Sequence, residues 1–130
     1  MLKDIDFKKK LDVGIAVVEE DGAYNTYIIN FRDEEIKTIL ITSKGYGQID
    51  GRKKETTIFR RMIDTMKPQS FMKFEPLDPE VFKIFNEFWV SFSSKEGMLD
   101  KKFLFAPESI IEDNFIKVPL IEKKGVMIRQ

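Results

Sequence analysis

Short stretches in which apolar residues alternate with polar or small residues recur along the chain, and turn-forming residues separate them. Val13, Ile15 and Val17 show this alternation first, and it predicts a strand because successive strand side chains point to opposite faces. The Asp21-Gly22 pair suits the positive φ angles of a tight hairpin, which predicts an antiparallel return strand. Six or seven strands are expected on these grounds, within residues 13–17, 24–31, 36–42, 71–75, 88–92, 99–105 and 115–121.

The third of these stretches is expected to be central. It contains Ile39, Leu40 and Ile41 in succession, which indicates apolar cover on both faces of the strand. The residues that follow, 43–54, combine glycines with basic side chains and are expected to form a loop.

One segment, residues 57–66, has the spacing of an amphipathic helix. Its apolar residues recur at spacings of one, three and four, which places them on one helical face. Thr56 is a candidate N-cap, and Pro68 would end the helix. A second, short helix is expected to begin at Asp78-Pro79-Glu80, which combines a cap, a first-turn proline and an acid. The apolar residues of the main helix are Ile58, Phe59, Met62, Ile63 and Met66.

These elements predict a single α+β domain over residues 1–130. A curved, mainly antiparallel sheet of six or seven strands would pack on the main helix at about 57–66, with one or two further helical turns. The longest apolar runs have about four or five residues, far below the ~20 needed to cross a bilayer. Residues 1–10 lack the apolar stretch of a secretory signal. A cytoplasmic location without membrane association is therefore expected.

The sequence contains no cysteine and no histidine. The first absence excludes disulfides, thiolate nucleophiles and cysteine-ligated zinc. The second removes the usual general base near neutral pH and the commonest transition-metal ligand. Chemistry by this chain alone is thereby limited to carboxylates, lysines, hydroxyls or Mg²⁺, and no cofactor and no metal site is expected.

Two arrangements are compatible with catalysis but lack supporting motifs. Ser70 and Lys73 have the spacing of a serine nucleophile and its lysine base, yet in a strand they would point to opposite faces. Glu75 and Glu87 flank aromatic strands and would form an acid and base pair if folding brought them together. A carboxylate- or Mg²⁺-dependent enzyme is therefore the alternative to a binding protein, and it is the less expected of the two.

Residues 44–67 are the most basic part of the chain. They contain seven Lys or Arg and three acidic residues, a net charge of +4, whereas the 22 basic and 22 acidic residues of the whole chain cancel. Backbone amides freed by glycines, basic side chains and a tyrosine together suit a phosphate or an unstacked base. The segment predicts a site for an anion or a nucleic acid such as RNA, against the alternative of a solvated surface. Its candidate contact residues are Lys44, Tyr46, Arg52, Lys53, Arg60 and Arg61.

Most of the twelve Phe, the one Trp and the six Met are expected to form the core. Trp89 differs, because it alternates away from the face shared by Phe88, Val90 and Phe92. It is a candidate for an aromatic pocket, as in a small-ligand carrier, or for a self-association surface. A homodimer through an edge strand or an apolar face is the further expectation.

Five short motifs extend over nearly the whole chain, at residues 43–47, 86–91, 101–103, 107–110 and 125–128. They read Ser-Lys-Gly-Tyr-Gly, Asn-Glu-Phe-Trp-Val-Ser, Lys-Lys-Phe, Pro-Glu-Ser-Ile and Gly-Val-Met-Ile. Together they resemble a family of small bacterial proteins of about 130 residues without an established activity. The label phenylalanyl-tRNA synthetase, which is associated with that family, is not supported, since the ATP-binding and aminoacylation motifs are missing. The resemblance implies at most an accessory or RNA-facing role, and it transfers no functional residue.

The sequence therefore predicts a small binding or interaction module rather than an enzyme. Its basic segment, residues 44–61, would contact an anionic or nucleic-acid partner.

Overall fold

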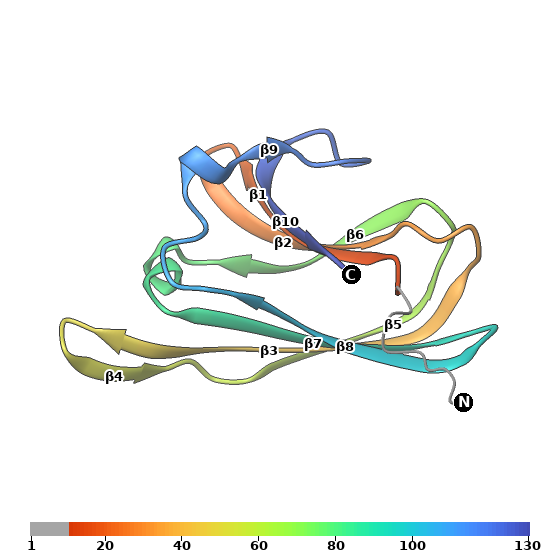
Figure 1. Ribbon diagram of the computed structural model, residues 1–130, viewed down its shortest axis with the longest axis horizontal. Coiled ribbons are helices and arrows are strands. Elements are labelled where there is room, and N and C mark those ends of the chain that lie inside the picture. Colours follow the sequence, from red (N-terminus) through yellow and green to blue (C-terminus); the bar gives the residue numbers. More distant parts are fainter. Residues whose placement is uncertain (1–10) are drawn as a thin grey trace, which may run out of the picture.

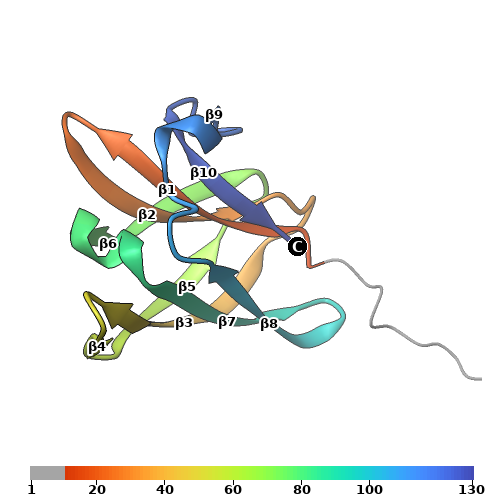
Figure 2. The same cartoon turned by 60° about the vertical axis from the view of Figure 1, so that its left-hand side comes forward.

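The computed structural model describes residues 11–130, which form two antiparallel β-sheets stacked face to face (Figures 1 and 2). The first sheet contains β1 (Val13–Glu20), β2 (Ala23–Asn30), β6 (Ser70–Leu77), β9 (Ile116–Lys117) and β10 (Lys124–Arg129). The second contains β3 (Ile36–Ile49), β4 (Arg52–Glu55), β5 (Phe59–Met66), β7 (Phe85–Ser94) and β8 (Gly97–Phe105). Two short 3₁₀ helices in these residues are η2 (Pro79–Lys83) and η3 (Glu112–Asn114). Residues 1–10, over which the sequence predicts no secretory signal, lie outside the described residues.

The strand order of the first sheet is β6–β2–β1–β10–β9, and that of the second is β4–β3–β7–β8, with β5 also paired to β3. The predicted α+β class is therefore wrong, although the antiparallel pairing is confirmed. Strands contain 64% of the residues and helical turns 7%, and the described part of the chain has no helix of seven or more residues.

The predicted main helix, at residues 57–66, is instead strand β5. Its apolar residues do not share a buried face, because Ile63 and Met66 are buried while Ile58 and Met62 are 51% and 58% exposed. Pairing with β3 places β5 at an edge of the second sheet, and these long-range contacts outweigh the local helical spacing.

The misleading spacing of three residues arises from an irregular step in the strand pair. Ile63 and Met66 of β5 are paired with Ile39 and Ile36 of β3. All four side chains are buried, although the two residues from each strand are three positions apart. Between Ile36 and Ile39, Thr38 has a φ of 51°, and the register of β3 shifts against β7. Such a step sends residues three apart to the same face and resembles a helical repeat.

The predicted hairpins are confirmed. Strands β1 and β2 pair through a turn at Asp21 and Gly22, whose φ angles are 52° and 84°. Strands β7 and β8 pair up to Ser94 and Gly97. The predicted cap is also present, because the Asp78 side chain accepts a hydrogen bond from Glu80 N at the start of η2, which is a short 3₁₀ helix.

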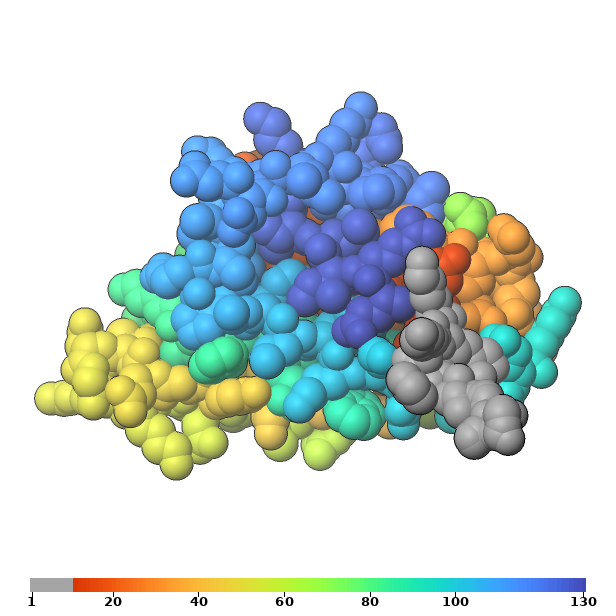
Figure 3. Space-filling model, viewed as in Figure 1, coloured from red at the N-terminus to blue at the C-terminus, as the bar shows by residue number. Residues whose placement is uncertain are grey.

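Residues 43–54 form a hairpin rather than the predicted loop. Strand β3 continues to Ile49 and pairs with β4 across a turn at Asp50 and Gly51, whose φ angles are 53° and 78°. All four side chains of β4 are exposed, so this ribbon has no apolar alternation that the sequence could reveal. The hairpin extends beyond the stacked sheets at one end of the molecule, in yellow in Figures 1 and 3.

The predicted last strand, residues 115–121, is also wrong. Only Ile116 and Lys117 pair, as β9, and the main C-terminal strand is β10, which lies between β1 and β9. Gly125 makes this pairing possible, because a Cβ atom there would lie 2.1 Å from the Val17 carbonyl oxygen.

The main core lies between the sheets, and a smaller one lies on the outer side of the first sheet. In the smaller core, Val118 and Ile121 cover Ala16, Val18 and Ile29. The largest fully buried side chains of the main core include Phe88, Phe92, Phe103, Ile15 and Ile28. Among residues 11–130 there is no helix with the length and apolar character needed to traverse a bilayer.

Candidate functional site

The side of the second sheet that faces away from the core, called the outer face below, carries the candidate site. Alternation along β7 sends Phe88 and Val90 into the core and Trp89 outward, where 44% of its surface is exposed. Leu40 of β3 is also exposed on this face. The predicted apolar cover on both sides of the third strand is thus wrong, whereas its central position, between β5 and β7, is confirmed.

Trp89 lies in a row of cross-strand neighbours on the outer face. Arg60 of β5 is paired with Thr42 of β3, Thr42 with Trp89, and Trp89 with Lys102 of β8. Because adjacent strands are about 4.8 Å apart, the row spans about 14 Å. An exposed aromatic ring therefore has a cationic residue on either side of it.

A second aromatic group lies farther along the same strands. The rings of Tyr46 and Phe85 stack with centroids 5.5 Å apart, and Lys44 Nζ is 5.6 Å from the Tyr46 ring centroid. The Tyr46 hydroxyl donates to Glu87 Oε1 at 3.1 Å. Burial and this carboxylate raise the pKa of Tyr46, so its hydroxyl remains a protonated donor at neutral pH.

A hollow of about 500 Å³ surrounds Tyr46 on this side of the sheet. Lys102 Nζ is 4.0 Å from Glu87 Oε1, a loose contact. Within residues 11–130, Lys44, Lys53 and Arg60 take part in no ion pair, so their charges are available to a ligand. The hollow is lined by Lys44, Tyr46, Gly47, Gln48, Lys53, Glu55 and Glu87.

The structure brings together four of the residues singled out in the sequence. Lys44, Tyr46, Arg60 and Trp89 occupy the outer face, although the sequence assigns Trp89 to a separate pocket. Lys53 is paired with Gln48 beside them and lines the same hollow.

Arg52 and Arg61 do not join this group. Arg52 is paired with Ile49, on the other side of the β3–β4 hairpin from Tyr46 and Lys53. Arg61 is paired with Ile41, which is buried, and its Nη1 atom donates to the Phe74 carbonyl at 3.4 Å. Strand alternation separates them, because neighbouring residues of a strand point to opposite sides.

Two members of the surface, Lys102 and Phe85, are missed by sequence reasoning. The predicted hairpin of residues 88–92 and 99–105 contained the signal for Lys102, since its register places that lysine opposite Trp89. Phe85 could not be recognised without knowing that β3 extends past residue 42. Its partner Tyr46 lies in the segment that the sequence predicts to be a loop.

The surface also contains apolar side chains. Leu40, Met62 and Leu104 are between 39% and 58% exposed, and Met62 is directly opposite Leu40. They make the outer face amphipathic, with apolar contacts beside the cationic row.

The catalytic arrangements considered from the sequence do not form. Glu87 is on the outer face, whereas Glu75 lies between the sheets and accepts a hydrogen bond from Ser43 Oγ at 2.8 Å. Ser70 Oγ donates to the Lys67 carbonyl, and Lys73 Nζ is 3.2 Å from Glu20 Oε1. The described residues contain no group of three or more acidic side chains placed to hold a metal ion.

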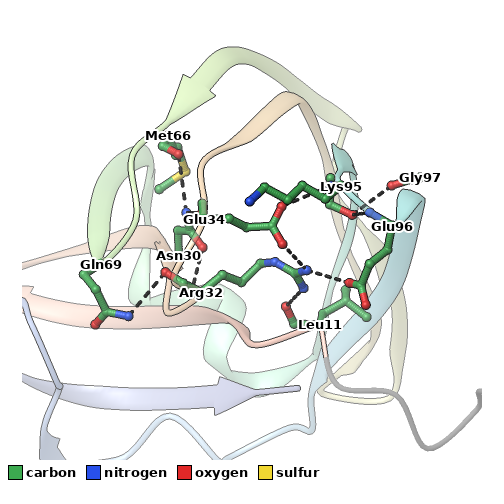
Figure 4. A network of polar contacts seen from close by, with 10 residues as sticks. Leu11, Asn30, Arg32, Glu34, Met66, Gln69, Lys95, Glu96 and Gly97 are labelled. Carbon is green, nitrogen blue, oxygen red and sulfur yellow. Dashed lines mark hydrogen bonds and ion pairs between the residues drawn. The ribbon is translucent and has the colours of Figure 1, made fainter.

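A polar cluster closes one end of the stacked sheets (Figure 4). Arg32 is 9% exposed, and its guanidinium donates to the Leu11 carbonyl at 2.7 Å, to Glu34 at 3.0 Å and to Glu96 at 2.6 Å. The Asn30 amide donates to the carbonyls of residues 34, 66 and 67. The Leu11 carbonyl and the two carboxylates thus bind the Nη1 and Nη2 atoms of the guanidinium, and we assign the cluster a structural role in joining the two sheets.

A comparison with known proteins found no protein-family model and no curated protein that matches this sequence.

Proposed function

We propose that this chain is a binding protein whose outer face takes up single-stranded nucleic acid. The observation that supports the proposal is the row in which Arg60 and Lys102 flank the exposed Trp89. An unstacked base can lie on an exposed aromatic ring, while basic side chains neutralise the phosphates on either side of it. The second aromatic group, with Lys44 beside Tyr46, would receive the strand farther along the sheet.

A single strand suits this surface better than a duplex. The outer face presents its aromatic rings on a sheet, and the bases of a duplex are stacked on one another and unavailable to such rings. The proposal places the chain in the cytoplasm as a nucleic-acid-binding module and assigns it no catalytic residue.

The test uses the fact that Trp89 is the only tryptophan. Titration with a single-stranded oligouridine of about 12 nucleotides is expected to quench its fluorescence and raise the anisotropy of a labelled probe. Trp89→Ala should weaken binding by about tenfold or more, the usual loss for one stacked base. A duplex of the same length should bind more weakly than the single strand.

The arginines allow a matched comparison. Arg60→Gln should weaken binding and reduce its salt dependence, whereas Arg52→Gln, the same change on the other side of the hairpin, should have little effect. Equal effects of the two substitutions, or unchanged Trp89 fluorescence, would refute the proposal.

Light scattering tests the alternative that the outer face serves self-association. A homodimer whose Trp89 emission changes with protein concentration, without any response to the oligonucleotide, would assign the outer face to self-association instead.

A further inference from the structure

A cleft lies where the two sheets separate, away from the outer face. Strands β5 and β6 are consecutive in the chain but belong to different sheets. Near Phe59 and Leu77, at the ends of these strands remote from their connection, a cleft of about 260 Å³ lies between them. Its polar lining consists of Ser43, Lys44, Thr56, Thr57, Glu75, Asp78 and Asn86.

Glu75 is held in this cleft by its neighbours on both sheets. Its backbone carbonyl accepts from Thr26 Oγ1 at 2.7 Å, and its carboxylate Oε1 accepts from Ser43 Oγ at 2.8 Å. Within the described residues no lysine or arginine forms an ion pair with this carboxylate. A carboxylate withdrawn from water without a cation is unfavourable, and a cationic ligand would relieve that cost.

The other charged side chains around the cleft have their contacts outside it. Lys44 Nζ lies over the Tyr46 ring on the outer face, and Asp78 Oδ1 accepts from Glu80 N at 2.9 Å. Arg61 Nη1 donates to the carbonyl of Phe74 on the adjacent strand β6. Glu75 is therefore the acidic group in the cleft that is available to a ligand.

The rest of the lining suits a ligand with several N–H donors and an apolar body. Asn86 is 4% exposed, and its amide nitrogen donates to the carbonyls of Val81 and Ile84 at 2.8 and 3.1 Å. Both amide hydrogens are thus used, and the side-chain oxygen remains as an acceptor. The apolar lining consists of Ile58, Phe59, Pro76, Leu77, Val81 and Phe88.

We propose that this cleft binds a small organic cation, with a primary ammonium or guanidinium group on Glu75 and an apolar group against the phenylalanines. A metal ion is a poorer match, because calcium and magnesium need several oxygen ligands and the described residues provide no group of three acids. The cleft shares Lys44 with the hollow on the outer face, but its acidic group, Glu75, lies between the sheets, and cation binding there does not depend on nucleic-acid binding.

The experiment uses benzylamine and phenylguanidine as probes, followed by amide NMR spectra of the full chain. Both are expected to shift the amide signals of Ser43, Glu75 and Asn86. Benzyl alcohol and benzoate, which have the same ring without the positive charge, should not do so. Binding should weaken as the pH falls, because burial raises the pKa of Glu75 and its protonation removes the charge.

Glu75→Gln should weaken amine binding at least about tenfold, whereas Glu122→Gln, the same change at an exposed ion pair with Lys117, should leave it intact. If the unmodified protein bound benzyl alcohol and benzylamine equally well, the proposal would be overturned, and this result does not depend on the stability of the variant. Undiminished amine binding by Glu75→Gln, or the absence of amide shifts with either amine, would overturn it as well.

Discussion

Replacing Glu20 by glutamine tests how the first sheet is joined to the segment that covers its outer side. The side chain of Glu20 is 10% exposed. Its Oε2 atom accepts from Lys123 Nζ at 2.6 Å and from the Tyr27 hydroxyl at 2.8 Å. Its Oε1 atom accepts from Asn25 Nδ2 at 2.9 Å and is 3.2 Å from Lys73 Nζ. One carboxylate thus connects β1, β2, β6 and the turn before β10.

The expected magnitude follows from the pKa of Glu20. Burial by itself raises this pKa, but the hydrogen bonds from Lys123, Tyr27, Asn25 and Lys73 lower it from 4.5 to about 2. Against an ordinary pKa in the unfolded chain, this shift corresponds to about 3 kcal/mol of stability. Both lysines are about half exposed, so solvent screening reduces the expected loss in Glu20→Gln to about 1–2 kcal/mol.

The stability that the Glu20 carboxylate contributes should also depend on pH. Because the pKa of Glu20 is lower in the folded state, its contribution is complete above about pH 4.5 and disappears as the pH falls through about 2. Urea unfolding should therefore show a difference in the free energy of unfolding between the unmodified protein and Glu20→Gln at neutral pH, and this difference should become smaller in acid. Glu122→Gln is the control, since its ion pair with Lys117 is exposed and should contribute almost nothing. A loss of stability in Glu20→Gln that is independent of pH, or that is no larger than the loss in Glu122→Gln, would refute the reasoning.

Four further substitutions test the fold. Met62→Lys should change the free energy of unfolding by less than about 0.5 kcal/mol, because this side chain lies on the outer face. Ile63→Lys should prevent folding, as circular dichroism would show, because Ile63 is buried. If residues 57–66 formed a helix, both substitutions would be severely destabilising. Gly125→Ala should destabilise the protein by about 2 kcal/mol or more in urea unfolding, because its Cβ would clash with the Val17 carbonyl. Arg32→Met should lower stability by about 2–3 kcal/mol, less than for a fully buried pair because one carboxylate partner is 40% exposed; an unchanged thermal midpoint would contradict its structural role.

Part of the candidate site could be predicted from the sequence. The charge of the 44–67 segment identified Lys44, Tyr46 and Arg60, and alternation around Trp89 showed that it points away from the core. That these side chains share one face depends on the pairing of β3 with both β5 and β7. The predicted β7–β8 hairpin contained the signal for Lys102, through its register with Trp89. The Glu75 cleft could not be found from local patterns, because it lies between strands of different sheets.

The sequence by itself determined the elements that depend on neighbouring residues. The β1–β2 turn follows from Asp21-Gly22, the start of η2 from the Asp78 cap, and the absence of disulfides from the absence of cysteine. Only the tertiary structure decided whether residues 59–66 form a helix or a strand, since Ile63 and Met66 fit a helical face equally well before their pairing with β3 is known. The same holds for β10, whose place beside β1 requires the close backbone contact at Gly125. Local conformational preferences can be read from adjacent residues, whereas partners distant in the chain are selected by the packing of the whole core.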